Sequence, residues 1–181
     1  MDGPIKTEPE ESIAAFWDQP CYRFFHWPPS PTEFKIDQIY DACQFLERVI
    51  DEQGPFDGVI GFSMGSVMSL AVILRHAELH PEQPPSALFQ FAILFSSPNI
   101  PDTDGFGGKA TWSKIRIPSL HICGEADEEW FEKSKQTFQT NCQGGTARLI
   151  VHKGGHLIPK DKPTVDKVID AIADLFEDAD V

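Results

Sequence analysis

Apolar residues recur at every third or fourth position over residues 36–52, and this spacing predicts an amphipathic helix that a glycine-proline pair ends. Residues 66–79 are apolar on nearly every side, which is typical of a helix buried against a sheet. Further helices are predicted over residues 128–142 and 164–176. The chain is therefore expected to contain helices that differ in how deeply they are buried.

Short apolar runs separate these helices. Residues 56–61, 88–95, 119–123 and 147–151 have the length and the aliphatic or aromatic content of buried strands. Strands that alternate with helices predict a mostly parallel sheet covered on both faces, and hence a three-layer α/β fold. Residues 96–113, rich in proline and glycine, are expected to form a long irregular excursion of the kind that carries a lid or a pocket rim.

The first 31 residues lack a clean period and are rich in proline and aromatic residues, so they are expected to form an ordered but irregular covering layer. Their aromatic side chains could line a pocket, but they more often fill space in a core. They include Tyr22, Phe24, Phe25 and Trp27. At 181 residues with 41% hydrophobic content, we expect a single domain over residues 1–181.

The formal net charge of −13 would repel a polyanion, so we expect neither nucleic acids nor anionic membranes as partners. No apolar run approaches the length of about 20 residues that a membrane-spanning helix needs. The four cysteines form no C-x-x-C pair, and the chain opens without a basic and then apolar leader. We therefore expect a cytoplasmic protein with reduced cysteines.

Gly61-Phe62-Ser63-Met64-Gly65 matches the pattern G-x-S-x-G. It lies between a predicted buried strand and a predicted buried helix, the context in which this pattern forms a sharp turn that exposes the serine hydroxyl. We expect both glycines to be required, because a larger side chain at either position would collide where the strand and the helix approach each other. The helix also directs its positive end toward the turn.

Two side chains that could activate Ser63 follow later strands. Asp127 comes shortly after residues 119–123, and His156 follows residues 147–151 through two glycines. Because the carboxyl ends of parallel strands meet at one edge of the sheet, we expect the three side chains to converge. The order serine, aspartate, histidine is that of the α/β-hydrolases. Taken singly, Asp127 could cap a helix and His156 could be a surface histidine, but coincidence at three strand ends is not expected.

Other candidate groups fit less well. Glu125 is the second choice for the acid that orients the histidine. His152 and His156 have an H-x-x-x-H spacing, but the glycines between them disfavour a helix that would direct both at one zinc ion, so His152 is interpreted as structural or as part of the rim. Residues 105–108 lack the lysine and hydroxyl residue of a phosphate loop. We expect neither a metal site nor a cofactor site.

This set of residues predicts hydrolysis of an ester or thioester through an acyl-serine intermediate. Ser63 would be the nucleophile, His156 the base and then the acid, and Asp127 the group that orients the imidazole. The backbone N–H of Met64 would donate to the oxyanion. Two alternatives stay open: a catalytically impaired binding or scaffold protein, and an acyltransferase in which an alcohol or amine replaces water.

The chain resembles the FSH1 serine hydrolases of fungi and animals over nearly its whole length. The resemblance implies an α/β-hydrolase fold and a catalytic triad of Ser63, Asp127 and His156. It also implies that the substrate is a small-molecule ester, or an acyl chain held as a thioester on a carrier protein, as in fungal polyketide and other secondary-metabolite biosynthesis. The matching residues are 2–4, 21–25, 54–65, 117–121, 124–127 and 154–156, of which the serine turn is the most specific.

Members of this family carry a strand and a His-Gly loop upstream of the Asp2-Gly3-Pro4 segment, with which this chain begins. We therefore expect an N-terminally shortened sheet whose exposed edge would favour a homodimer. The upstream loop resembles one that supplies a second oxyanion donor, which would leave the N–H of Met64 as the donor that can be identified. Loss of one such donor typically costs about 3 kcal/mol.

Overall fold

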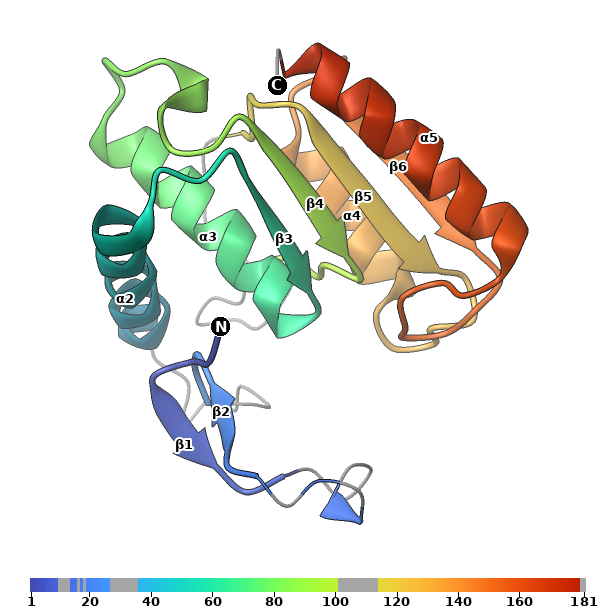
Figure 1. Cartoon of the computed structure of the whole chain (residues 1–181), viewed down its shortest axis with the longest axis horizontal. Coiled ribbons are helices and arrows are strands. Elements are labelled where there is room, and N and C mark those ends of the chain that lie inside the picture. The colour runs from blue at the N-terminus through green and yellow to red at the C-terminus, as the bar shows by residue number, and fades with distance from the viewer. Residues whose placement is uncertain (10–13, 16, 18, 27–35, 101–113, 180–181) are drawn as a thin grey trace.

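The computed structural model describes residues 1–9, 14, 15, 17, 19–26, 36–100 and 114–179. Its centre is a sheet of four parallel strands in the order β3-β4-β5-β6 (Figure 1). The expected parallel sheet is therefore confirmed. The strands are β3 (Gly58–Phe62), β4 (Phe91–Phe95), β5 (Ser119–Gly124) and β6 (Ala147–His152).

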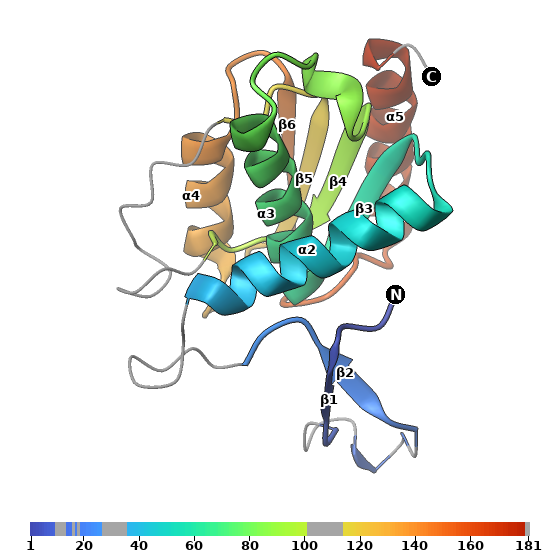
Figure 2. The same ribbon diagram turned by 90° about the vertical axis from the view of Figure 1, so that its left-hand side faces the viewer.

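Helices cover both faces of this sheet, which gives the expected three layers. Helices α3 (Met64–Leu79) and α4 (Phe131–Asn141) lie on one face, and α2 (Ile36–Gln53) packs against α3. Helix α5 (Lys162–Asp178) lies on the opposite face, as the two views show (Figures 1 and 2). Because α3 joins β3 to β4 and α4 joins β5 to β6, each crossover returns the chain to the same end of the sheet.

Strand β4 shows how the sheet divides the core. All five of its residues are buried, as its place inside the sheet requires. Ala92 and Leu94 join the apolar cluster beneath α2 and α3, whereas Phe91, Ile93 and Phe95 join the cluster beneath α5. Because successive side chains of a strand point to opposite faces, one continuous apolar run contributes to both layers.

Several element boundaries differ by a few residues from those expected, and two of these differences have clear local reasons. The strand expected over residues 88–95 begins at Phe91, because Pro85–Ala87 form a short 3-10 helix, η1, just before it. The last helix begins at Lys162, earlier than expected. Asp161 caps it, since its side chain accepts a 3.0 Å hydrogen bond from a backbone N–H of the first turn.

The first 31 residues were expected to form an irregular layer, but the part of them that the structure describes contains regular structure. Strands β1 (Ile5–Thr7) and β2 (Cys21–Arg23) pair into a small antiparallel sheet that lies apart from the main one (Figure 2). At Gly3 an added Cβ would lie 2.3 Å from backbone atoms of β2, so this approach requires glycine. The side chain of Phe25 is buried in the core and anchors the segment, while Trp27 falls outside the described residues.

Strand β3 is an edge strand in the part of the chain that the structure describes. It pairs with β4 on one side, and the side chain of Ile60 is 68% exposed. Among the described residues β3 thus has a neighbouring strand on one side, and the homodimer expected through its other edge stays a prediction. A cleft of about 350 Å³ follows this edge, lined by residues of β3, α2, α3 and the N-terminal segment.

Two further expectations concern the whole chain. Residues 101–113, most of the expected lid or rim segment, lie outside the described residues, and a single domain over residues 1–181 stays a prediction. None of the helices within the described ranges combines the length and the apolar composition needed to cross a lipid bilayer.

Candidate active site

The turn between β3 and α3 holds Ser63 in a backbone conformation that is costly for a residue with a side chain. Its φ is 53° and its ψ is −120°. The N–H of Ser63 donates to the carbonyl oxygen of Phe95 over 3.0 Å, and the carbonyl oxygen of Ser63 accepts from the N–H of Val67 over 3.1 Å. These bonds to β4 and α3 maintain the strained turn, which presents the hydroxyl at the carboxyl end of β3.

The two glycines of the turn differ in what they require. A Cβ on Gly61 would lie 2.6 Å from the carbonyl oxygen of Gly65, so a side chain there is excluded, as expected. Beyond its chain neighbours and the backbone of its own helix, a Cβ on Gly65 would meet no described atom within 4 Å. The expectation of a collision at Gly65 is therefore wrong, because this residue faces the cleft beside β3 and not the body of the sheet.

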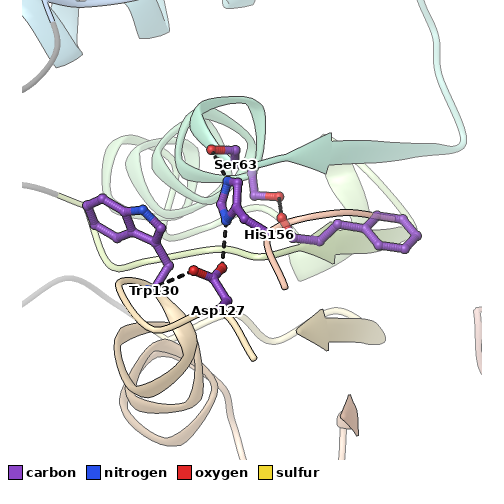
Figure 3. Close-up of polar contacts among 6 residues, drawn as sticks. Ser63, Asp127, Trp130 and His156 are labelled. Carbon is purple, nitrogen blue, oxygen red and sulfur yellow. Dashed lines mark hydrogen bonds and ion pairs between the residues drawn. The ribbon is translucent and has the colours of Figure 1, made fainter. Parts of the chain in front are cut away.

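Ser63, His156 and Asp127 meet at the carboxyl edge of the sheet (Figure 3). Nε2 of His156 lies 2.9 Å from Oγ of Ser63, and Nδ1 lies 2.6 Å from Oδ2 of Asp127. An ionised carboxylate can only accept a hydrogen bond, so Nδ1 carries the proton and Nε2 is left to accept from the hydroxyl. The predicted convergence of the three side chains is present in the structure.

The buried position of Asp127 fixes its orientation. Its side chain is 5% exposed, whereas that of His156 is 32% exposed. While Oδ2 faces the imidazole, Oδ1 accepts a 3.1 Å hydrogen bond from the backbone N–H of Trp130, the residue before α4 (Figure 3). Both carboxylate oxygens therefore have a donor, and the acid is held by a second contact that does not depend on the imidazole.

The loops after β5 and β6 approach each other closely. Two backbone hydrogen bonds of 2.8 and 3.1 Å join them, from the N–H groups of Glu125 and Ala126 to carbonyl oxygens of His152 and Gly154. A Cβ on Gly124 would lie 2.2 Å from the carbonyl oxygen of Gly154. Glycine at this position therefore allows the loops that carry the acid and the imidazole to lie side by side.

The backbone N–H of Met64 is available next to the serine. Met64 is the first residue of α3, so its N–H has no acceptor within the helix. It also lies at the positive end of the helix dipole. An oxygen that gains negative charge beside Ser63 would be stabilised by a donor in this position.

The remaining sequence candidates lie outside this hydrogen-bonded group. The carboxylate of Glu125 forms an exposed ion pair with Lys153 over 2.7 Å, so Asp127 and not Glu125 faces the imidazole. His152 is buried, and its Nδ1 accepts a 3.1 Å hydrogen bond from the N–H of Gly154, which favours the structural interpretation over a place on the rim. Within the described ranges, no group of three or more histidine, cysteine or acidic residues is arranged to hold a metal ion.

A second buried histidine is part of the core. Nε2 of His121 lies 3.2 Å from Sγ of Cys142, and its ring packs edge-on against Phe138. Burial lowers the pKa of His121 to about 4 and raises the pKa of Cys142 to about 11. Both groups are therefore neutral at neutral pH, and this pair stabilises the layer between β5 and α4.

The structure adds a residue that the sequence did not single out. The ring of Phe62 lies against the imidazole of His156, with 5.1 Å between the ring centroids. Phe62 occupies a variable position of G-x-S-x-G, so the motif carries no signal for it. It forms one wall beside the imidazole and is itself 38% exposed.

Comparison with known proteins identifies relatives along most of the chain. A family model described as serine hydrolase (FSH1) matches residues 1–168. Hydrolase phiM of Talaromyces stipitatus is 30% identical over 181 residues, and the match covers 93% of this chain and 70% of that protein. Family of serine hydrolases 3 of Saccharomyces cerevisiae is 35% identical over 162 residues, covering 88% of this chain and 59% of the yeast protein. Esterase FPY3 of Fusarium mangiferae is 31% identical over 182 residues, covering 95% and 78%.

Solved structures share the fold at much lower sequence identity. A carboxylesterase from Mesorhizobium loti aligns with a TM-score of 0.61 and 17% identity over 95% of this chain and 73% of that one. Acyl-protein thioesterase 2 of Zea mays aligns with a TM-score of 0.57 and 16% identity over 91% and 76%. The architecture is thus that of α/β-hydrolase-type esterases, and the match to residues 1–168 shows that this chain belongs to the FSH1 family of serine hydrolases.

Proposed function

We propose that the protein hydrolyses carboxylic esters and acyl thioesters through an acyl intermediate on Ser63. The observation that carries this proposal is the continuous pair of hydrogen bonds from the Ser63 hydroxyl to His156 and from His156 to Asp127. Membership of a serine hydrolase family and the relative named as an esterase support it.

The first half of the reaction forms the acyl-enzyme. Nε2 of His156, 2.9 Å from the hydroxyl, takes the proton while Oγ of Ser63 attacks the carbonyl carbon. Asp127 stabilises the imidazolium that results through the 2.6 Å contact to Nδ1. The carbonyl π electrons move onto oxygen, and the N–H of Met64 donates to this oxyanion. Collapse of the adduct then expels the alcohol or thiol, which takes the proton from Nε2.

The second half releases the acid. Water reaches the acyl carbon beside His156, whose side chain is 32% exposed, and gives one proton to Nε2 as its oxygen attacks. The second adduct collapses, the proton passes from Nε2 to Oγ of Ser63, and the carboxylic acid leaves. The enzyme returns to its starting protonation state, so the cycle consumes only ester and water.

The proposal includes thioesters because a thiol is a better leaving group than an alcohol. Its lower pKa lets it depart with less help from the imidazolium. The family resemblance implies a more specific substrate, an acyl chain that is released from a carrier protein in secondary-metabolite biosynthesis. Comparing turnover of matched alkyl esters and thioesters of one acyl group would rank the two substrate classes.

A fluorophosphonate probe tests the proposed function. A serine hydroxyl activated by histidine displaces fluoride from phosphorus, so native protein is expected to be labelled at Ser63 and heat-denatured protein is not. Mass spectrometry of the peptides locates the label. Ser63→Ala should abolish labelling, and Ser86→Ala, which changes an exposed serine of η1, should retain it.

Two outcomes would count against hydrolysis. Native protein that takes up no label and turns over no ester would contradict the proposal and favour a binding or scaffold role. If an added alcohol or amine captured the acyl group in preference to water, the products would identify an acyltransferase.

Gly124→Ala is expected to lower kcat/KM for an ester by roughly 100-fold. The added Cβ would overlap the carbonyl oxygen of Gly154 at 2.2 Å and push apart the loops that carry Asp127 and His156. Steady-state kinetics checks this, with circular dichroism to verify folding. Gly144→Ala is the matched control, because a Cβ there would meet no described atom within 4 Å. Equal rates for the two variants would mean that the loop contact does not position the acid and the base.

A further inference from the structure

The loop after β6 carries His156 but contains no helix or strand that would hold the imidazole in place. Residues 153–158 of this loop are exposed or half-buried, so their side chains do not anchor it in the core. The last buried side chain before the imidazole is that of His152, the final residue of β6, which is 4% exposed. On this side, the position of His156 therefore depends on His152 and on the backbone of the loop.

The ring of His152 packs against the backbone of the loop. The N–H of Gly154 donates to Nδ1 of His152 over 3.1 Å, and a Cβ added to Gly154 would lie 3.0 Å from the same nitrogen. The carbonyl oxygen of Gly154 accepts a 3.1 Å hydrogen bond from the N–H of Ala126, in the loop that carries Asp127. The two peptide groups that flank the Cα of Gly154 are therefore both fixed, one by the imidazole of His152 and the other by the loop after β5.

This contact requires one tautomer of His152. Because Nδ1 accepts the hydrogen bond, the proton of the neutral ring lies on Nε2. Nε2 is buried and has no hydrogen-bond partner among the described residues. An unpaired buried donor costs at least as much free energy of unfolding as one typical hydrogen bond contributes. Stability therefore does not account for a histidine at this position, and the acceptor that Nδ1 offers to the loop is the property that does.

We propose that His152 is a positioning residue for the base of the reaction. By accepting from the N–H of Gly154, its Nδ1 sets the conformation of the loop that places the imidazole of His156. This inference rests on the proposed function, because it concerns the group that takes the serine proton there. His152 acts through the loop and not on the reacting atoms. The contacts that depend on it are the 2.9 and 2.6 Å contacts of the His156 imidazole to Ser63 and Asp127.

Two substitutions separate the acceptor from simple packing. His152→Asn keeps an acceptor, because the amide oxygen is as many bonds from Cα as Nδ1 is, whereas His152→Leu fills similar space without one. We expect His152→Leu to lower kcat/KM for a p-nitrophenyl ester at least about tenfold, mainly through kcat, and His152→Asn to stay within about threefold of the wild type. A role in packing alone predicts the opposite order, since leucine suits a buried position better than asparagine does.

His121→Leu is the matched control. His121 is a buried histidine of β5, 3% exposed, and its Nε2 contacts Cys142 and not the loop after β6. Its replacement should lower the thermal midpoint of unfolding but leave kcat/KM within about threefold of the wild type. Normal kcat/KM in His152→Leu, or an equal loss in His152→Leu and His152→Asn, would overturn the proposal.

A measurement on the wild-type protein does not depend on how the variants fold. The ¹⁵N resonances of the His152 ring should show a proton on Nε2 and none on Nδ1, and the amide of Gly154 should exchange slowly with solvent. A proton on Nδ1 of His152 would overturn the proposal, because that nitrogen could not then accept from the loop.

Proton NMR also separates this proposal from the proposed function. In Ser63→Ala protein, which cannot form the acyl-enzyme, the proton between Nδ1 of His156 and Asp127 should resonate far downfield, as expected of a short hydrogen bond to a carboxylate. Adding His152→Leu should shift or remove this resonance, and adding His152→Asn should retain it. A resonance that His152→Leu leaves unchanged overturns the positioning role even if esters are hydrolysed. The expected pattern in a protein that takes up no label and turns over no ester overturns the proposed hydrolysis and keeps the positioning role.

Discussion

Ser63→Ala is expected to lower kcat for an ester substrate by at least about 10⁴-fold while the protein stays folded. The variant keeps the backbone turn but removes the oxygen that would form the acyl-enzyme. His156→Ala should cause a loss of similar size, because the hydroxyl 2.9 Å away then has no base. Single-turnover and steady-state assays of both variants with one p-nitrophenyl ester would measure these effects.

The double variant is the more discriminating measurement. If serine and histidine act as one unit, Ser63→Ala/His156→Ala should be no slower than either single variant. Losses that multiply would mean that the two residues contribute through separate mechanisms. His80→Ala serves as the control for loss of a histidine, since its side chain is 43% exposed and lies at the far end of α3.

Asp127→Asn is expected to lower kcat by about 10⁴-fold. The asparagine amide can donate a hydrogen bond to Nδ1 of His156, which stabilises the tautomer that carries its proton on Nε2. That nitrogen can then no longer accept the proton of Ser63. The same steady-state assay measures the loss, and circular dichroism checks that the fold is retained.

Glu125→Gln is the matched control for the acid. Glu125 lies in the same loop, but its carboxylate pairs with Lys153 at the surface, so removing its charge should change kcat by less than about twofold. The opposite result, a slow Glu125→Gln and a normal Asp127→Asn, would identify Glu125 as the orienting acid. This pair of variants therefore tests the assignment of the acid without relying on either variant alone.

The α/β arrangement could be predicted because local patterns in this chain agree with the layers they form. The apolar run that became β4 is buried on both sides, and the three-four spacing of residues 36–52 became the face by which α2 packs on α3. The first residues of the chain were harder to predict. Their pairing as β1 and β2 depends on hydrogen bonds between segments about 16 residues apart, which no local period records.

The position of the site could be predicted from the sequence, because the carboxyl ends of parallel strands lie at one edge of a sheet whatever its detailed packing. Once the strands are parallel, Ser63, Asp127 and His156 must follow carboxyl ends at one edge of the sheet. The sequence did not distinguish the two acids as sharply, since Glu125 and Asp127 occupy the same turn. Backbone hydrogen bonds between that turn and the loop after β6 give Glu125 an exposed position and turn Asp127 inward.

By itself, then, the sequence determined the strand-turn-helix around Ser63 and the order of the three functional groups, because periodicity and turn chemistry act over a few neighbouring residues. Only the tertiary structure decided that Gly124 must lack a side chain, that Gly65 faces open space and that Phe62 lies against His156. The cleft beside β3 is another feature that only the tertiary structure decided. Each of these features is a close approach between segments distant in the chain, and packing in three dimensions, not local propensity, sets such distances.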